Sequence, residues 1–154
     1  MTRPGNALTL LAEAGISLPA APPPVGHYAR AHRVGDLLWV AGHTARAADR
    51  PPVCGVVGED VDVETAVADA RRAAVNLLAA AHQTVGLERL SGVVHLRGYV
   101  RTASDFTAHP AVIDGASTLL SSVFPDAPAH SRAAIGVASL PGGACVELEA
   151  VFAL

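Results

Sequence analysis

Apolar and polar positions recur with two different periods along the chain, which predicts both helices and strands. From Asp62 onward apolar residues return every three or four positions, and this spacing predicts a long helix with Asp62 at its N-cap. A second helix is predicted over residues 110–123, with Pro110 in its first turn, and a short one over residues 8–16. Strands are predicted over residues 28–34, 37–41, 53–57, 90–101, 132–138 and 144–152.

The order of these elements predicts an α+β fold. Two or three strands come first, and a helix, a strand, a helix and two final strands follow. Strands mixed with two helices that share one sheet face are typical of an α+β sandwich. Residues 18–25, called the strap below, are too rich in proline for regular structure. We therefore expect an N-terminal helix and strap over residues 1–24 and a single domain over residues 25–154.

Two patterns predict which side chains face the core. On the long helix one face is apolar, and Asp69 and Asn76 fall largely outside it. The last strand alternates between an apolar core face and a face that carries Cys145, Glu147 and Glu149. The two carboxylates are about 7 Å apart along one strand face. In water they are hydrophilic surface, whereas cover by another subunit raises the pKa of at least one and suits it to acid–base catalysis.

Composition narrows the classes of function. Hydrophobic residues make up 51% of the 154 residues and charged ones only 16%, which is consistent with a buried subunit interface. The net charge is −3 and all 11 basic residues are arginine, so the sequence provides neither a basic surface for nucleic acid nor a lysine for Schiff-base or Walker-type chemistry. No apolar run approaches the roughly 20 residues of a membrane span. We expect a soluble, cytoplasmic protein without a membrane or nucleic-acid partner.

Nucleophile and metal motifs are absent from the sequence. The seven histidines form no HxH or HExxH pattern, and the two cysteines have no metal-binding spacing, so no metal site is expected. No G-x-S-x-G string exists for a serine hydrolase. Cys145 lies in a strand without an adjacent histidine, which favours a small core residue over a nucleophile.

Arg132 stands out because it begins an otherwise apolar strand. Such an arginine either pairs with an acidic residue or offers its guanidinium to a carboxylate ligand. If the last two strands formed a tight hairpin, Arg132 would lie roughly 13 Å from Glu147. Two explanations remain open: the strands are not simple partners, or a pocket combines residues of two subunits.

Several strings in order, over residues 24–154, resemble the RidA/YjgF family of imine deaminases, whose members are also described as L-PSP endoribonucleases. Asp105-Phe106 matches a pair common in the family, and Arg72 and Asn76 lie where the family has its long helix. The N-terminal stretch and the string over residues 113–117 resemble a bacterial subgroup with an added N-terminal segment. The other strings that carry the resemblance cover residues 26–31, 37–42, 132–141 and 146–150.

The resemblance implies a fold, an assembly and an activity. The fold is chorismate-mutase-like, and three copies form a homotrimer around a barrel-like centre with pockets at the subunit interfaces. Members of the family hydrolyse reactive enamines and imines, such as 2-aminoacrylate, to 2-oxoacids and ammonia. The resemblance implies no metal or organic cofactor, and the partner it implies is a small carboxylate or imine.

Five residues of this chain match functional positions of the family. Arg132 matches the arginine that binds the substrate carboxylate, and Glu147 matches the glutamate that positions or activates water. Tyr28 matches a tyrosine of the pocket, and the backbone of Ala134 matches main-chain groups that contact the ligand. Ser104 stands where many members have an asparagine. The resemblance therefore implies a catalytic Arg132–Glu147 pair, with Tyr28, Ala134 and Ser104 around the substrate.

Departures from the family pattern suggest a different or larger imine. His27 and Ala29 replace a proline and a serine, whereas Ala41 and His43 replace a serine and a glutamine. Whether His27, His43 or His109 enters the pocket stays open, as does the protonation state of the glutamate. The alternatives are a pathway-specific enzyme that performs dehydration, cyclisation or hydrolysis, and a trimer that binds a metabolite without turnover. Ribonuclease activity is disfavoured by the negative charge, the absent lysine and the few aromatic residues.

Overall fold

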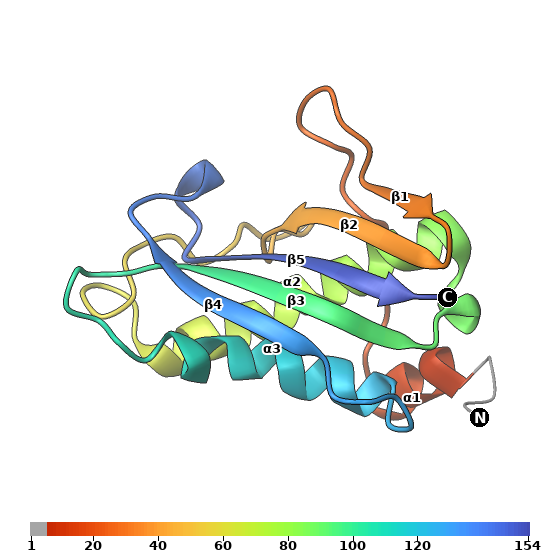
Figure 1. Ribbon diagram of the computed structural model, residues 1–154. Coiled ribbons are helices and arrows are strands. Elements are labelled where there is room, and N and C mark those ends of the chain that lie inside the picture. Colours follow the sequence, from red (N-terminus) through yellow and green to blue (C-terminus); the bar gives the residue numbers. More distant parts are fainter. Residues whose placement is uncertain (1–5) are drawn as a thin grey trace.

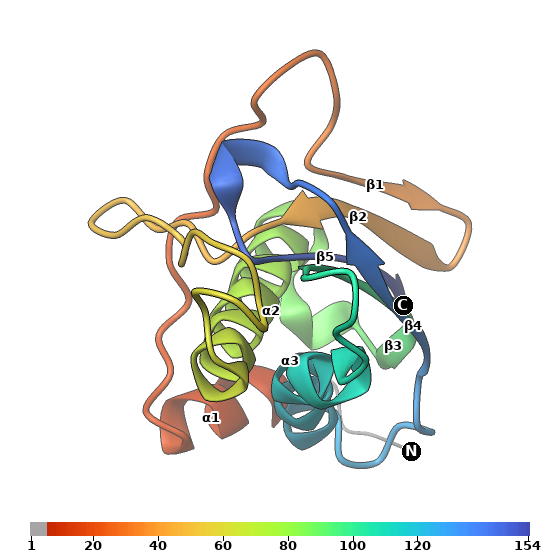
Figure 2. The same ribbon diagram turned by 90° about the vertical axis from the view of Figure 1, so that its left-hand side faces the viewer.

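A computed structural model describes residues 6–154 and shows two layers, a five-stranded sheet with helices on one face and an open face opposite (Figures 1 and 2). The α+β fold with two long helices on one sheet face is confirmed, and α1 adds a shorter helix that packs against α3. The elements are α1 (Asn6–Glu13), β1 (Ala31–Val34), β2 (Leu37–His43), α2 (Val63–Val85), η1 (Leu87–Arg89), β3 (Gly92–Arg101), α3 (His109–Val123), β4 (Ser131–Val137), η2 (Pro141–Gly143) and β5 (Val146–Ala153).

The strands follow the order β1-β2-β5-β3-β4 across the sheet. Neighbouring strands are antiparallel except β3 and β4, which run parallel because α3 crosses over between them. Strand β5 is the last along the chain, yet it lies between β2 and β3 and pairs with both. Strands β4 and β5 are therefore not neighbours. This order excludes the tight hairpin considered above and leaves β3 between Arg132 and Glu147.

The core lies between the sheet and the helices α2 and α3. Small side chains set the distance between these helices, because a Cβ at Gly115 of α3 would meet the backbone carbonyl of Val67 on α2. The predicted core face of the last strand is confirmed. Its buried residues are Val146, Leu148, Ala150 and Phe152.

Helix α2 begins where the sequence predicts. The carboxylate of Asp62 accepts a hydrogen bond of 2.7 Å from the backbone N–H of Thr65, and this bond lowers the pKa of Asp62. The helix ends before Gly86, whose N–H donates to the carbonyl of His82. None of the helices formed by residues 6–154 is long and apolar enough to cross a membrane.

Two polar residues of α2 are buried, so their predicted place outside the core face was wrong. Asp69 is fully buried and accepts a hydrogen bond of 2.5 Å from Arg72 Nη2. Asn76 is 4% exposed and donates 2.8 Å hydrogen bonds to the carbonyls of Thr44 and Arg46. Because these partners come from the same helix and from the loop after β2, the two side chains satisfy their polar groups inside the molecule.

The segment over residues 53–57 also differs from the prediction. It forms no strand and makes only isolated bridges, including one from Cys54 to Ala144. The thiol of Cys145 does not share a face with Glu147, because its Sγ points toward α2 and lies 3.6 Å from Asp69 Oδ2. Burial and the charge of Asp69 raise the pKa of Cys145 to about 12. This cysteine is the buried core thiol that the sequence predicts.

Candidate functional site

The open face of the sheet carries a groove of about 1070 Å³. Its walls come from the strap and the turn after it, between residues 22 and 30, from the segment over residues 41–54, and from η2. Figure 2 shows the strap rising from α1 past the edge of the sheet, so that its end and the turn after it lie with η2 on the side opposite α2 and α3. The side chains of Glu147 and Glu149 enter the groove from β5. The groove thus contains the two carboxylates that share one face of the last strand.

Glu147 is a half-buried carboxyl on this face. Its carboxyl lies against Gly42 of β2, where an added Cβ would overlap Glu147 Oε1. Burial raises the pKa of Glu147, and the charge of Glu149 raises it further. Glu149 is itself held by Arg97, whose Nη1 lies 2.6 Å from Glu149 Oε1. A carboxyl with a raised pKa in a groove suits proton transfer near neutral pH.

The substitution Gly42→Ala tests this packing. The added methyl group occupies the position of Glu147 Oε1, so the carboxyl must turn toward solvent. We expect the pKa of Glu147 to fall toward the ordinary glutamate value of about 4.3. NMR titration of carbon-13-labelled glutamate carboxyls measures it, with Glu64 on the exposed side of α2 as an internal reference. An unchanged pKa of Glu147 would show that Gly42 does not set the position of this carboxyl.

Tyr28 and His43 line the groove beside Glu147. Tyr28 is 50% exposed, and its hydroxyl oxygen accepts a hydrogen bond of 3.3 Å from the N–H of Val25 in the strap. Nδ1 of His43 lies 2.7 Å from the carbonyl of Ala41 and therefore donates to it. Burial lowers the pKa of His43, and the charge of Arg30 lowers it further, so this ring is neutral at pH 7. The sequence left the place of His43 open, and the structure puts it in the groove.

Arg132 lies on the opposite face of the sheet. It pairs in register with Leu96, a fully buried residue of β3, so its side chain is on the face that carries the helices. Its Nη1 donates to Asp114 Oδ1 at 2.7 Å and to Ser117 Oγ at 3.0 Å, and its Nη2 donates to the carbonyl of Pro110 at 3.3 Å. All three partners belong to α3, which fixes one edge of the guanidinium.

A histidine extends this cluster. His130 Nε2 lies 3.0 Å from Ser117 Oγ, which also accepts the hydrogen bond from Arg132. Burial lowers the pKa of His130, and the charges of Arg132 and His95 lower it further. A neutral His130 accepts a hydrogen bond from the hydroxyl of Ser117, and the oxygen of this hydroxyl is then free to accept a hydrogen bond from Arg132. The pattern of the sequence alone did not indicate this cluster.

One chain therefore does not gather the five predicted site residues into one pocket. Tyr28 and Glu147 line the groove, whereas Arg132 and Ala134 lie on the helix-bearing face of the edge strand β4. Ser104 is exposed in the loop between β3 and α3. Among the described residues, no three side chains of His, Cys, Asp or Glu gather closely enough to hold a metal ion.

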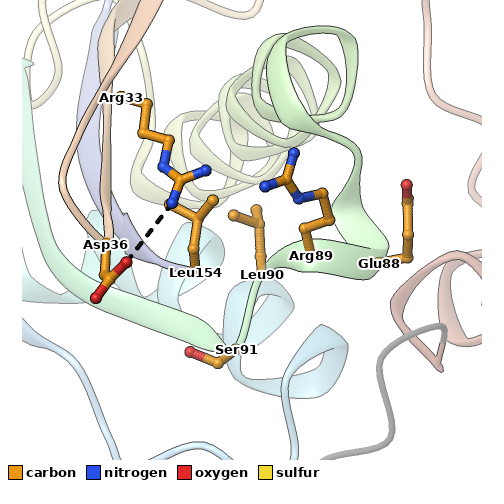
Figure 3. A pocket seen from close by; sticks show the side chains of 7 residues that line it. All are labelled: Arg33, Asp36, Glu88, Arg89, Leu90, Ser91 and Leu154. Atoms are coloured by element: carbon orange, nitrogen blue, oxygen red, sulfur yellow. Dashed lines mark ion pairs between the residues drawn. The ribbon is translucent and has the colours of Figure 1, made fainter.

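A second, smaller pocket of about 440 Å³ lies where η1 approaches the turn between β1 and β2. Figure 3 shows the guanidinium groups of Arg33 and Arg89 above Leu90 and Leu154. Arg33 Nη2 lies 3.6 Å from a carboxylate oxygen of Asp36. None of the five predicted site residues lines this pocket.

Known proteins match this chain in both sequence and fold. The sequence model of the family described as Endoribonuclease L-PSP matches residues 18–154, which is most of the chain. The chain belongs to the RidA/YjgF family. Nearly all of the strings that resemble this family fall inside the matched region, so the predicted family is confirmed.

The relatives of this RidA/YjgF chain span nearly its whole length. Protein TCP17 of Trypanosoma cruzi is 34% identical over 152 residues, which cover 97% of this chain and 95% of that protein. A 2-iminobutanoate/2-iminopropanoate deaminase of Dermatophagoides farinae is 29% identical over 137 residues, 88% of this chain and 92% of the deaminase. A solved structure of a protein of unknown function from Agrobacterium tumefaciens has a TM-score of 0.89 and 34% identity, and the match covers 99% of this chain and 94% of that one. An imine deaminase is thus among the relatives.

Proposed function

We propose that this protein hydrolyses reactive enamines and imines of the 2-aminoacrylate type to 2-oxoacids and ammonia. The observation that carries the proposal is the half-buried carboxyl of Glu147 in the groove, because its raised pKa suits a group that takes up and returns a proton. The relative named as a deaminase of 2-iminobutanoate and 2-iminopropanoate supports the reaction class.

In this reaction Glu147 acts first as a base and then as an acid. Its carboxylate removes a proton from water while the water oxygen bonds to the imine carbon, and the nitrogen receives the C=N electron pair and a proton from solvent. Glu147 then returns its proton to the nitrogen, the C–N bond breaks and ammonia leaves. The hydroxyl oxygen releases its remaining proton to solvent and becomes the carbonyl. The sum is imine plus water giving 2-oxoacid plus ammonia.

Arg132 anchors the substrate carboxylate in this proposal. Its Nη1 is occupied by Asp114 and Ser117, whereas its Nε forms no hydrogen bond with residues 6–154. Nη2 uses one of its two N–H groups for the carbonyl of Pro110, so its second N–H and the N–H of Nε form an edge that is left for the paired hydrogen bonds that a carboxylate accepts from a guanidinium. Asp114 and Ser117 hold the group so that this edge keeps its orientation.

The proposed pocket combines two subunits of a homotrimer. Because Arg132 and Glu147 lie on opposite faces of one sheet, we propose that the groove of one subunit meets the β4 edge of the next, with Ala134 and Ser104 beside the substrate. Exposed apolar side chains on the open face support a contact between copies: Trp39 is 49% exposed and Ile135 is 40% exposed. Aromatic residues of this kind are enriched at protein interfaces.

The test is the release of ammonia or pyruvate from 2-aminoacrylate generated in situ. We expect acceleration by the wild type, and a loss of about 10²-fold in kcat/KM for Arg132→Ala because two charge-assisted hydrogen bonds disappear. The matched control is Arg71→Ala, an exposed arginine of α2 that does not line the groove. No acceleration by the wild type would overturn the proposed function, and full activity of Arg132→Ala would overturn the role of the arginine.

A second candidate is a pathway-specific reaction on a larger intermediate in the same pocket. The size of the groove favours this candidate, because ligand pockets usually span roughly 300–1,000 Å³ and 2-aminoacrylate is a three-carbon acid. The groove, at about 1070 Å³, lies just above that range. Screening imines of increasing length in the same assay separates the two candidates.

A further inference from the structure

We propose that Arg46 and Arg50 bind a second anionic group of the substrate, so that dicarboxylic imino acids are the preferred substrate class. Both arginines line the groove that contains Glu147. The inference rests on the proposed imine hydrolysis and adds which imines the site accepts.

Two guanidinium groups in the groove are available to a ligand. Of the three arginines that line it, Arg30 is already engaged: its Nε and Nη2 donate to the carbonyl of Pro22, and its Nη1 donates to Gln83 at 2.7 Å. The side chains of Arg46 and Arg50 are exposed and form no hydrogen bond or ion pair with residues 6–154. A ligand can therefore take their hydrogen bonds without breaking an existing contact.

The carboxylates of the groove leave this positive charge in excess. Asp49, Glu147 and Glu149 also line the groove, but Glu149 is bound by Arg97, which lies outside the lining. Because the pKa of Glu147 is raised, this carboxylate is protonated at a higher pH than an ordinary glutamate and then carries no negative charge. The groove is therefore lined by three arginines and by only two carboxylates, Asp49 and Glu147, that form no ion pair with the described residues. The excess of positive charge attracts anions.

The loop that carries these arginines is fixed at its base. Asn76, which is buried on α2, donates its amide hydrogens to the carbonyls of Thr44 and Arg46 at 2.8 Å. The turn that follows is closed by a hydrogen bond of 2.8 Å from the N–H of Ala47 to the carbonyl of Arg50. Because the backbone is held on both sides of the turn, the two arginines lie at a defined wall of the groove, and a ligand has to order their side chains but not the loop that carries them.

In the proposed reaction Arg132 binds one carboxylate of the substrate, so Arg46 and Arg50 remain available for a second one. A substrate with one carboxylate leaves Arg46 and Arg50 in water, whereas a second carboxylate at the far end of the substrate accepts charge-assisted hydrogen bonds from them. The groove of about 1070 Å³ that these two arginines line has space for a substrate longer than 2-aminoacrylate. The charge and the size of the groove therefore point to the same substrate class.

The experiment compares two imines with the same five-carbon chain. Amino-acid oxidases generate 2-iminoglutarate from glutamate and 2-iminopentanoate from norvaline. Semicarbazide forms the same semicarbazone from an imine and from its 2-oxoacid but reacts faster with the imine, so hydrolysis is measured as the decrease in the initial rate of semicarbazone formation. We expect the wild type to favour 2-iminoglutarate by about tenfold in kcat/KM, at the low end for charged hydrogen bonds because both arginines are exposed. The double variant Arg46→Ala/Arg50→Ala is expected to lose this preference through a fall of about tenfold in kcat/KM on 2-iminoglutarate.

Two further variants separate binding from structure. Arg71→Ala removes an exposed arginine outside the groove and is expected to keep the preference. Arg46→Glu/Arg50→Glu is expected to reverse it, because two carboxylates then repel the second carboxylate of 2-iminoglutarate. A merely structural role would lower both rates without a reversal.

The outcomes distinguish this inference from the proposed function. Failure of the wild type to hydrolyse 2-aminoacrylate as well as both imines overturns the proposed function, whereas hydrolysis of 2-aminoacrylate alone overturns only the preference for dicarboxylic imines. Hydrolysis of both imines, with a ratio that the double alanine variant leaves unchanged, overturns the role of Arg46 and Arg50 alone. A preference that disappears in the double variant and reverses with glutamate at both positions supports the second anion site.

Discussion

Mixing two nearly inactive variants is expected to restore activity. Arg132→Ala lacks the carboxylate anchor and Glu147→Gln lacks the base, so each alone is expected to keep about 1% or less of the wild-type rate in the proposed reaction. In a mixed trimer, a pocket is complete where a subunit that keeps Arg132 meets a neighbour that keeps Glu147. Random assembly from equal amounts gives about one quarter of all pockets this composition, and in the mixed trimers about one pocket in three is complete. Co-expression of the two variants with different affinity tags, followed by purification of the mixed species, measures the recovered rate.

The control for this experiment is a chain that carries both substitutions. When it is mixed with Glu147→Gln, no pocket contains both groups, so no recovery is expected. Activity that stays at the level of the separate variants would show that Arg132 and Glu147 do not act across a subunit interface. The opposite faces on which the structure places these residues make recovery the expected result.

Glu147→Gln is expected to have the second large effect. Loss of the proton acceptor lowers kcat by about 10²–10⁴-fold, whereas KM changes little because the carboxylate anchor remains. The wild-type rate also falls as the pH decreases through the raised pKa of Glu147, since a protonated carboxyl cannot accept a proton. Stopped-flow measurement of kcat/KM against pH for the wild type and the variant shows whether the acidic decrease depends on this residue.

The same substitution is expected to stabilise the fold at neutral pH. The folded state raises the pKa of Glu147, so its ionised form is disfavoured there and the associated loss of stability is greatest above that pKa. Glutamine removes this effect, and the Tm at pH 7 rises while the Tm at pH 4 changes less. A lower Tm at pH 7 would contradict the assignment of a destabilising, functional carboxylate.

The sequence predicted local features well. The cap at Asp62 follows from one residue type at one position, and the alternation over residues 146–152 requires only neighbours along the strand. These features depend on physical effects within a few residues of chain. The family resemblance was also carried by short strings.

Features that depend on distant partners could not be predicted. Asp69 and Asn76 look like surface residues of a helix, and they are buried only because Arg72 and the loop carbonyls of Thr44 and Arg46 satisfy them. The neighbours of a strand are likewise set by the whole sheet, which is why β5 was not recognised as a central strand. For the same reason the sequence did not show that Arg132 and Ala134 lie on the face of the sheet opposite Glu147.

The central place of β5 has a consequence for synthesis of the chain. Strands β1 and β2 form one part of the sheet and β3 and β4 the other, and β5 is the strand that joins them. Because β5 follows the other four strands along the chain, the two parts of the sheet cannot join through it until it has left the ribosome. Nascent chains of this protein therefore depend on late, long-range pairing, which exposes them to chaperones and to aggregation before the fold is complete.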